Sequence, residues 1–166
     1  MPTAPRAAAS VLIFLLLLAA GAANTTAWAA SPCARPGTPL EAKALAEKAA
    51  AHLAVVGPGK AFNDFMTHGD DYMPCDLYVL VFDQKGQMWV NGRFPGMIGS
   101  NIADAADSNG RRFLLDAMRR AANEGSAWVE YQWYNPCTGT AMPKSTHIVR
   151  AGQFFVGVGA YGRLSV

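Results

Sequence analysis

Residues 77–91 read LYVLVFDQKGQMWVN, and this stretch decides the fold class of the chain. Its first part, Leu77 to Phe82, is an unbroken run of apolar, β-branched and aromatic residues, which is typical of a strand covered on both faces. Asp83-Gln84-Lys85-Gly86 has the composition of a hairpin turn, and Gln87 to Asn91 predicts the returning strand. The stretch therefore predicts an antiparallel hairpin within a larger sheet.

The segment before this hairpin predicts a long helix. Thr38 is placed to cap it, Pro39 takes the first helical position, and Glu41 completes a capping box. The helix is expected to continue to Val56, and Gly57-Pro58-Gly59 ends it. Two further pieces lie before the first strand: a short helix, Lys60 to Met66, and a polar loop, Thr67 to Pro74.

A long polar loop, one helix and three strands follow the hairpin. The loop, residues 92–110, is rich in Gly, Asn and Asp, and loops of this length usually have functional or binding roles. The later elements are a helix over Arg111 to Glu124 and strands over Trp128 to Tyr134, Thr146 to Arg150 and Phe154 to Tyr161. Five strands linked mostly by hairpins, with a long helix before them, indicate one α+β domain with helices packed on an antiparallel sheet.

Residues 1–29 have the character of a signal peptide. The apolar run Val11 to Ala23 is shorter than the roughly 20 residues of a membrane span, and Ala27-Trp28-Ala29 fits a cleavage site, with Ala20-Gly21-Ala22 as an earlier option. Residues 30–37 are then a short connecting segment and residues 38–166 the domain. We expect a periplasmic or secreted protein; the alternative is an inner-membrane anchor formed by an uncleaved N-terminal segment. No second apolar segment follows, so we expect no output domain in this chain.

Charge and cysteine content narrow the classes of partner and cofactor. Of the 14 Lys and Arg residues, only Arg6 lies in the predicted signal peptide, which leaves a mature net charge near +1 and no basic run that would favour nucleic acid. Cys33, Cys75 and Cys137 would enter an oxidising compartment, where they permit one disulfide and leave one thiol over. The sequence has no Cys-x-x-Cys motif and its three histidines are scattered, so we predict neither a metal nor a cofactor.

A series of short motifs gives the chain a family resemblance. In order they are Asp76-Leu77-Tyr78-Val79, Gly92, Gly99-Ser100-Asn101, Asp107 with Gly110, Trp128-Val129-Glu130-Tyr131, Asn135-Pro136, Pro143-Lys144-Ser145 and Gly157-Val158-Gly159-Ala160-Tyr161. Together they resemble the type 2 single Cache domain over roughly Thr38 to Tyr161. The resemblance implies a PAS-like sheet of strand order 2-1-5-4-3 behind a long N-terminal helix. It also implies a ligand-sensing domain of the kind found in chemoreceptors and sensor kinases, where characterised members tend to bind small organic acids.

The sequence departs from the family pattern in two ways. Family receptors usually continue into a second membrane span and a cytoplasmic signalling module, which this sequence does not contain. Many members have a tyrosine where this chain has His147 and a histidine where it has Asn91. Because of these departures, the resemblance implies the fold more strongly than it implies a particular ligand or signalling output.

The last strand predicts a face with room for a ligand. Phe154, Val156, Val158 and Ala160 alternate on one face, which is suited to pack against a helix. Gly157, Gly159 and Tyr161 lie on the other face, where missing side chains leave either space for a cavity or a close approach of another element.

Rings and cations gather in the strands beside these glycines. Our candidate ligand-binding residues are Arg93, Tyr131, Trp133, Lys144, His147 and Tyr161. In this interpretation Lys144, with Arg93 as a second cation, holds a carboxylate. Tyr131 and Tyr161 donate hydrogen bonds, Trp133 forms an apolar wall, and protonation of His147 would strengthen binding below pH ~6.5. The alternative is that the rings are core residues and the cations lie on the surface.

The leading hypothesis is an extracytoplasmic module that binds a small organic acid and reports to a membrane sensor kinase or chemoreceptor, as a monomer or weak dimer. The alternative is an accessory interaction scaffold with a collapsed pocket. A small hydrolase is a further alternative, because Ser145 and His147 share a strand face, but no Gly-x-Ser-x-Gly or His-Glu-x-x-His motif is present and we predict no enzyme.

The implied strand order also predicts a disulfide. The start of strand 1 and the hairpin between strands 3 and 4 lie along one edge of such a sheet. We therefore expect Cys75 to pair with Cys137, leaving Cys33 over.

Overall fold

The computed structural model describes Met1 and residues 35–107 and 109–164. The predicted signal peptide beyond Met1, and Cys33, lie outside the described residues. None of the helices within the described ranges combines the length and the apolar character that crossing a bilayer requires.

Helix α1, Pro39–Thr67, begins as its sequence predicts. The Thr38 hydroxyl accepts from the Glu41 amide at 3.2 Å, and the Glu41 carboxylate accepts from the Thr38 amide at 2.9 Å, which is the complete capping box. Gly57 interrupts the helix with φ 78° and ψ 167°, and Pro58 follows it. The two predicted helices are therefore the two arms of one kinked helix.

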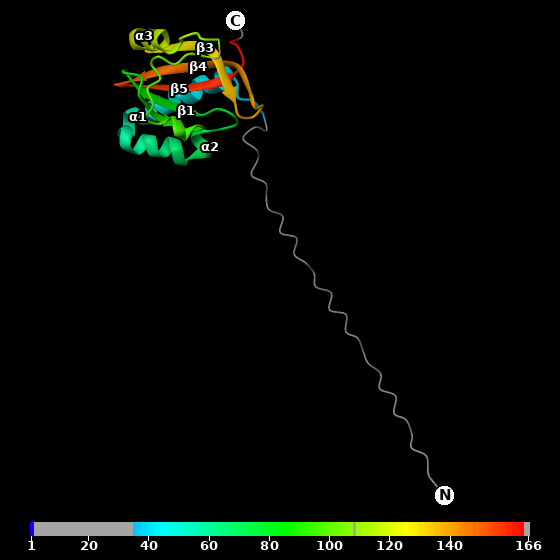
Figure 1. Ribbon diagram of the computed structural model, residues 1–166. Coiled ribbons are helices and arrows are strands. Elements are labelled where there is room, and N and C mark those ends of the chain that lie inside the picture. Colours follow the sequence, from blue (N-terminus) through cyan, green and yellow to red (C-terminus); the bar gives the residue numbers. More distant parts are fainter. Residues whose placement is uncertain (2–34, 108, 165–166) are drawn as a thin grey trace.

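The sheet has the predicted strand order. Its strands are β1 (Val79–Asp83), β2 (Met88–Asn91), β3 (Ser126–Asn135), β4 (Thr140–Ala151) and β5 (Phe154–Tyr161), arranged β2-β1-β5-β4-β3 with every neighbouring pair antiparallel. The expected α+β fold is confirmed (Figure 1).

Strand β4 begins six residues earlier than its sequence predicts, at Thr140 instead of Thr146. The cause is a tight β3–β4 hairpin in which Thr140 lies opposite Asn135, so that β4 pairs along the second half of β3 as well. Pro143 is tolerated there because β4 gains its second neighbour, β5, only from Lys144 onward.

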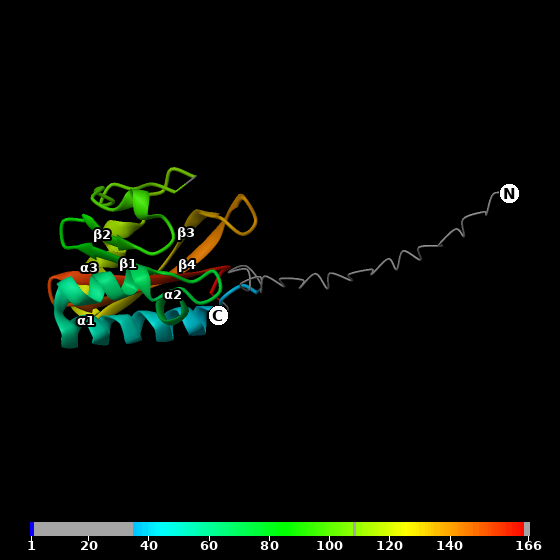
Figure 2. The ribbon, with the colours of Figure 1, turned by 90° about the horizontal axis from the view of Figure 1, so that it is seen from below.

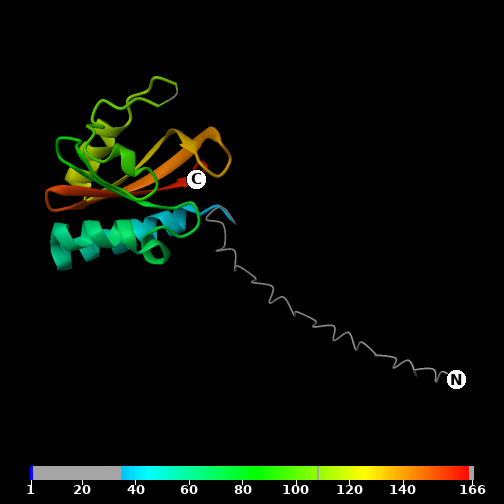
Figure 3. The same ribbon diagram turned by 60° about the horizontal axis from the view of Figure 1, so that its bottom comes forward.

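The two faces of the sheet are covered differently. Helix α1 packs across one face, and α3 (Leu114–Glu124) and the loop after β2 lie over the other (Figure 3). Seen from below, α1 and the four-residue helix α2 (Gly69–Tyr72) lie together on the same side (Figure 2). The loop after β2 contains one 3-10 turn, η1 (Pro95–Met97).

The alternation of β5 separates these faces as predicted. Phe154, Val156, Val158 and Ala160 all belong to the core beneath α1. Gly157 and Gly159 therefore face the other side, beneath α3 and the loop. We call these the helix face and the cavity face of the sheet.

Candidate ligand-binding site

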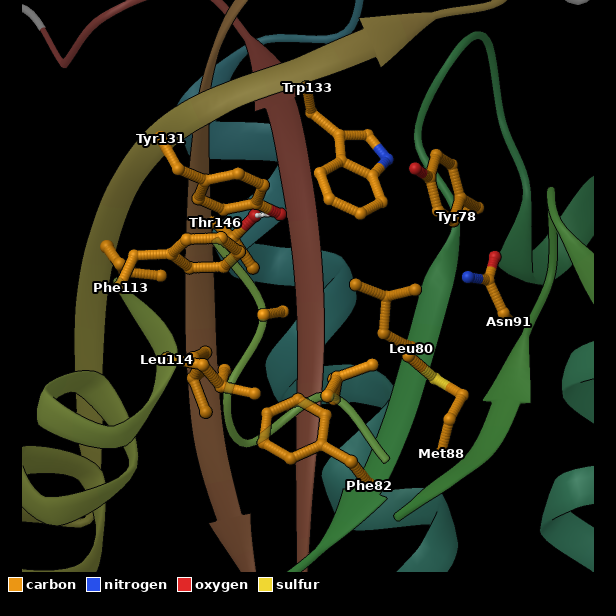
Figure 4. A pocket seen from close by; sticks show the side chains of 14 residues that line it. Tyr78, Leu80, Phe82, Met88, Asn91, Phe113, Leu114, Tyr131, Trp133 and Thr146 are labelled. Carbon is orange, nitrogen blue, oxygen red and sulfur yellow. Dashed lines mark hydrogen bonds between the residues drawn. The ribbon is translucent and has the colours of Figure 1, made fainter. Parts of the chain in front are cut away.

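A small cavity lies on the cavity face, between the sheet, the start of α3 and the loop after β2 (Figure 4). Its walls are mostly apolar, and it leaves about 40 Å³ for the centres of water molecules. The lining residues are Tyr78, Leu80, Phe82, Met88, Asn91, Ile102, Ala105, Phe113, Leu114, Val129, Tyr131, Trp133, Thr146 and Ile148.

The pairing register of the strands brings the predicted residues together. Lys144 on β4 lies directly opposite Tyr131 on β3 and Tyr161 on β5, so the three side chains share the cavity face. Thr146 follows two residues later on the same face, opposite Val129 and Gly159. Tyr78, just before β1, completes the group from the far side of β5.

Lys144 is buried at the edge of the cavity. Its side chain is 1 % exposed, and Nζ donates a hydrogen bond to the Tyr78 hydroxyl at 2.7 Å. Nζ also lies 3.9 Å from the ring centre of Tyr78 and 4.7 Å from that of Tyr161. A Cβ on Gly159 would overlap Cε of Lys144 and Oγ1 of Thr146, so the glycine is what gives both side chains their place.

The environment of Lys144 disfavours its charged form. Burial, together with a smaller effect of the Arg93 guanidinium, lowers the pKa of Lys144 to about 7, and the Asp76 carboxylate partly opposes this shift. Among the described residues no carboxylate lies within 4 Å of Nζ. Burial also raises the pKa of the Tyr78 hydroxyl, which stays protonated.

Tyr131 forms the opposite wall with Thr146. The two hydroxyl oxygens lie 2.9 Å apart, and the Tyr131 ring stacks on Phe113 with ring centres 4.0 Å apart (Figure 4). Trp133 meets the Tyr131 ring nearly edge-on and is half-buried. Both side chains line the cavity, as Trp133 does in its predicted role of an apolar wall; the predicted role of Tyr131 as a hydrogen-bond donor to the ligand stays a prediction.

Asn91 connects the cavity to the loop after β2. Its Oδ1 accepts from the amides of Arg93 and Phe94, at 3.3 and 2.8 Å, and its Nδ2 contacts Sδ of Met97 at 3.6 Å. The amide group lies beside Tyr78 at the cavity wall (Figure 4).

His147 does not belong to this site. It lies opposite Trp128 and Val158, which places it on the helix face, where Lys43 and Glu47 of α1 are the charged groups that act on it. Successive strand residues point to opposite faces, so His147 cannot share the cavity with Lys144, three residues earlier. The predicted ligand role of His147 is wrong, and the affinity increase expected on its protonation therefore has no structural basis. The single hydroxyl proton of Ser145 has two acceptors in reach, the Gly162 carbonyl at 2.8 Å and Glu130 Oε1 at 3.1 Å, and neither belongs to His147.

Arg93 and Tyr161 are not among the residues that line the cavity. The Tyr161 hydroxyl donates to the Tyr134 carbonyl at 2.7 Å, and its ring covers Lys144. Arg93 donates to the Cys75 carbonyl at 3.3 Å, and its buried Nε has no hydrogen-bond acceptor among the described residues. Both act on the site through Lys144 rather than by lining it.

The predicted Cys75–Cys137 disulfide is wrong, because Cys75 is a free thiol. Cys75 precedes β1, and Cys137 lies in the β3–β4 hairpin, while β5 separates β1 from β4. Two strand spacings amount to about 10 Å, beyond the Cα separation that a disulfide spans. The prediction relied on the β3–β4 hairpin reaching back across β5 to Cys75, and the free thiol of Cys75 contradicts it.

The family model for the single Cache domain 2 matches residues 38–162, which is nearly the whole described domain. This chain is a member of that family. Cache domains are sensory ligand-binding modules of the extracytoplasmic space rather than enzymes.

Solved structures of similar fold are sensor domains of chemotaxis proteins. A periplasmic sensor domain of a chemotaxis protein has a TM-score of 0.58 at 22% identity, covering 74% of this chain and 88% of that one. A methyl-accepting chemotaxis protein from Vibrio parahaemolyticus gives 0.58 at 17%, covering 71% and 82%. A Cache chemosensory domain described as recognising a carboxylic acid gives 0.57 at 15%, covering 75% and 88%. At these identities the similarity is evidence for a shared fold alone. The comparison with curated proteins gives no match.

Sequence reasoning missed three polar residues of this Cache domain's cavity: Tyr78, Asn91 and Thr146. Tyr78 alternates with Leu80 and Phe82, which put it on one face, but both faces of β1 are buried and the alternation carries no sign of which face holds a cavity. Thr146 shares the alternation of Lys144, and that signal was present in the sequence. Within the described ranges, no three His, Cys, Asp or Glu side chains gather in a way that could hold a metal.

Proposed function

We propose that this Cache domain senses a small carboxylic acid outside the cytoplasm. The observation that carries the proposal is Lys144, an amine that is 1 % exposed and that uses one of its three donors, toward Tyr78. A buried cation that no carboxylate contacts destabilises a fold, and the Asp76 carboxylate offsets this cost only in part. A ligand carboxylate in the adjacent cavity is the group that does so.

The Tyr78 hydroxyl is the natural donor to that carboxylate. Its oxygen accepts from Lys144 and its proton interacts with the Tyr161 hydroxyl, so a carboxylate in the cavity that Tyr78 lines competes with Tyr161 for that proton. A carboxylate bound there lies roughly 5 Å from Nζ, where opposite unit charges attract by about 3 kcal/mol at an effective dielectric constant of ~20. Lys144 thus contributes through Tyr78 rather than by the direct contact that we had predicted from sequence.

The size of the cavity restricts the ligand. Space of about 40 Å³ for water centres admits a molecule of a few non-hydrogen atoms. The apolar remainder of the wall, including Leu80, Phe82 and Met88, suits a short alkyl chain. Acids of two to four carbons fit both the polar and the apolar part.

The exported state and the partner belong to the same proposal. Cleavage after residue 29 would release the domain into the periplasm or the medium, and the alternative is an anchor formed by the uncleaved segment. We propose that the ligand state is read by a membrane sensor kinase or chemoreceptor, since the solved domains of similar fold are sensor domains of chemotaxis proteins.

Titration calorimetry tests the proposal directly. The full chain, expressed with its own N-terminal segment, is titrated with acetate, propionate, pyruvate and lactate, and with propionamide as an uncharged control of nearly the same shape. We expect at least one acid to bind and propionamide to bind at least tenfold more weakly, because the amide lacks the charge that Lys144 attracts. If no acid binds, the scaffold with a collapsed pocket becomes the better description; if acid and amide bind equally, Lys144 is not an anion site.

A further inference from the structure

The polar groups of the cavity fall into two sets rather than one. Tyr78, Asn91 and the indole nitrogen of Trp133 lie on one side, and the hydroxyls of Tyr131 and Thr146 lie on the other (Figure 4). A plain short-chain acid has polar atoms at one end, so it satisfies one set and presents only hydrocarbon to the other.

The hydroxyl pair of Tyr131 and Thr146 has unused hydrogen-bonding capacity. Two hydroxyls carry two protons, and their contact at 2.9 Å uses one of them. Among the described residues no other group bonds to either oxygen, although Tyr131 is 9 % and Thr146 3 % exposed. A buried donor that loses water without gaining an acceptor destabilises the state in which it is left unpaired.

The two sets are close enough for one small molecule to reach both. A Cβ on Gly159 would overlap both Lys144 Cε and Thr146 Oγ1, so these two atoms are near neighbours above β5. The Lys144 amine then reaches the Tyr78 hydroxyl at 2.7 Å. Tyr78, Tyr131 and Thr146 line the same small cavity, so a molecule with its carboxylate at Tyr78 has its remaining atoms on the side of the hydroxyl pair.

We propose that the ligand is a short hydroxy- or oxo-acid, whose carboxylate binds at Tyr78 and whose second oxygen bonds to the Tyr131–Thr146 hydroxyl pair. This inference rests on the proposed function, because it assigns a subclass to the acid that the domain senses. A hydroxyl or keto oxygen on the carbon beside the carboxylate accepts the free proton of the pair, whereas a methylene at that position leaves it unpaired. The pair thus sets specificity, and Lys144 with Tyr78 sets affinity for acids in general.

The test compares ligands that differ in this one oxygen. Propionate, pyruvate and the two lactate enantiomers are titrated into the wild type, and we expect pyruvate or one lactate to bind about ten- to a hundredfold more tightly than propionate, the range that one satisfied buried hydrogen bond supplies. The same titrations are then run on Thr146→Val, which removes the hydroxyl at nearly constant volume, and on Thr146→Ser, which keeps it.

The ratio of propionate to oxygenated-acid dissociation constants is the readout. We expect the ratio to fall toward one in Thr146→Val and to persist in Thr146→Ser; Tyr131→Phe serves as the second variant where Thr146→Val does not fold. A wild type that binds propionate as tightly as lactate and pyruvate overturns this inference and leaves the proposed function standing. A preference that survives in both Thr146→Val and Tyr131→Phe overturns it as well, and a wild type that binds no acid overturns both proposals.

Discussion

Strand β4 buries two basic side chains three residues apart, on opposite faces of the sheet, and their surroundings differ in one essential respect. On the cavity face, Lys144 has a hydrogen-bond partner in Tyr78, room above Gly159 and a cavity beside it. On the helix face, His147 is 2 % exposed, contacts Trp128 and has no hydrogen-bond partner for either ring nitrogen among the described residues.

Burial lowers the pKa of both groups, yet only one of them has space where a counter-ion can enter. The comparison shows that a buried base indicates a binding site when a cavity adjoins it, and otherwise only makes stability depend on pH. Four experiments sharpen or break this distinction.

Replacing Lys144 by methionine is expected to have the largest effect, and in opposite directions on binding and stability. Acid affinity should fall about ten- to a hundredfold, because the charge-assisted interaction is lost. The free energy of unfolding at pH 7 should rise by about 1–4 kcal/mol, because an apolar side chain replaces a buried base without a counter-ion. Urea unfolding and calorimetry measure the two effects. If Lys144→Met binds the acid normally, Lys144 does not attract the ligand. If the variant is less stable than the wild type, the charge of Lys144 does not destabilise the free protein.

The pH dependence of binding is the next largest effect. The acid favours protonated Lys144, whose pKa in the free protein is about 7, so above this pH binding must take up a proton. Affinity should fall as pH rises from 7 to 9, by at most about tenfold per pH unit. Calorimetry at pH 6.5, 7.5 and 8.5, each in two buffers of different ionisation enthalpy, detects the proton uptake directly. Residual binding by Lys144→Met should show no such dependence; a wild type with pH-independent affinity contradicts the prediction.

Two glycines of β5 provide a matched pair on the cavity face. In Gly159→Ala the new Cβ overlaps Lys144 and Thr146, and we expect a loss of about 1–3 kcal/mol of stability from overpacking, together with several-fold weaker binding. In Gly157→Ala the nearest atom is Cγ2 of Thr146 at 3.4 Å, an ordinary contact, so we expect less than about 1 kcal/mol. Thermal unfolding of both variants is the measurement. Equal losses would mean that the space above Gly159 does not position Lys144.

His147 should give the smallest effect, confined to acid stability. Burial lowers its pKa in the folded state, the nearby Lys43 lowers it further, and Glu47 partly opposes both. The unfolded chain therefore binds a proton more readily, so stability decreases as pH falls below the unfolded value of about 6.5, by at most about 1.4 kcal/mol per pH unit. His147→Leu should reduce this acid-induced loss without changing acid binding at pH 7.5. Urea unfolding at pH 7.5 and 5.5 measures the acid-induced loss of stability. A change in ligand affinity in His147→Leu would show that His147 does contribute to ligand binding.

Local patterns predicted the elements well because their causes are local. The capping box of Thr38 and Glu41, the break at Gly57 and the two-residue alternation of β5 each depend on neighbours within a few residues. Strand β4 begins earlier than its sequence predicts because it includes Pro143, a residue that strands usually exclude. Only the pairing of β4 with β3 shows that a proline fits at this position.

By itself the sequence determined the α+β class, the order of the helices and strands, the face of β5 that packs on α1, and the family resemblance. All of these follow from backbone periodicity, capping and motif order, which operate over short distances. The tertiary structure decided which face holds the cavity, that Tyr78 is the partner of Lys144, that His147 lies under α1, and that Cys75 stays apart from Cys137. Tyr78 and Lys144 are 66 residues apart, and β5, which lies between their strands, is made last in the chain. A contact between residues so far apart in sequence depends on both the strand order and the pairing register. The local sequence around Tyr78 or around Lys144 therefore does not predict it.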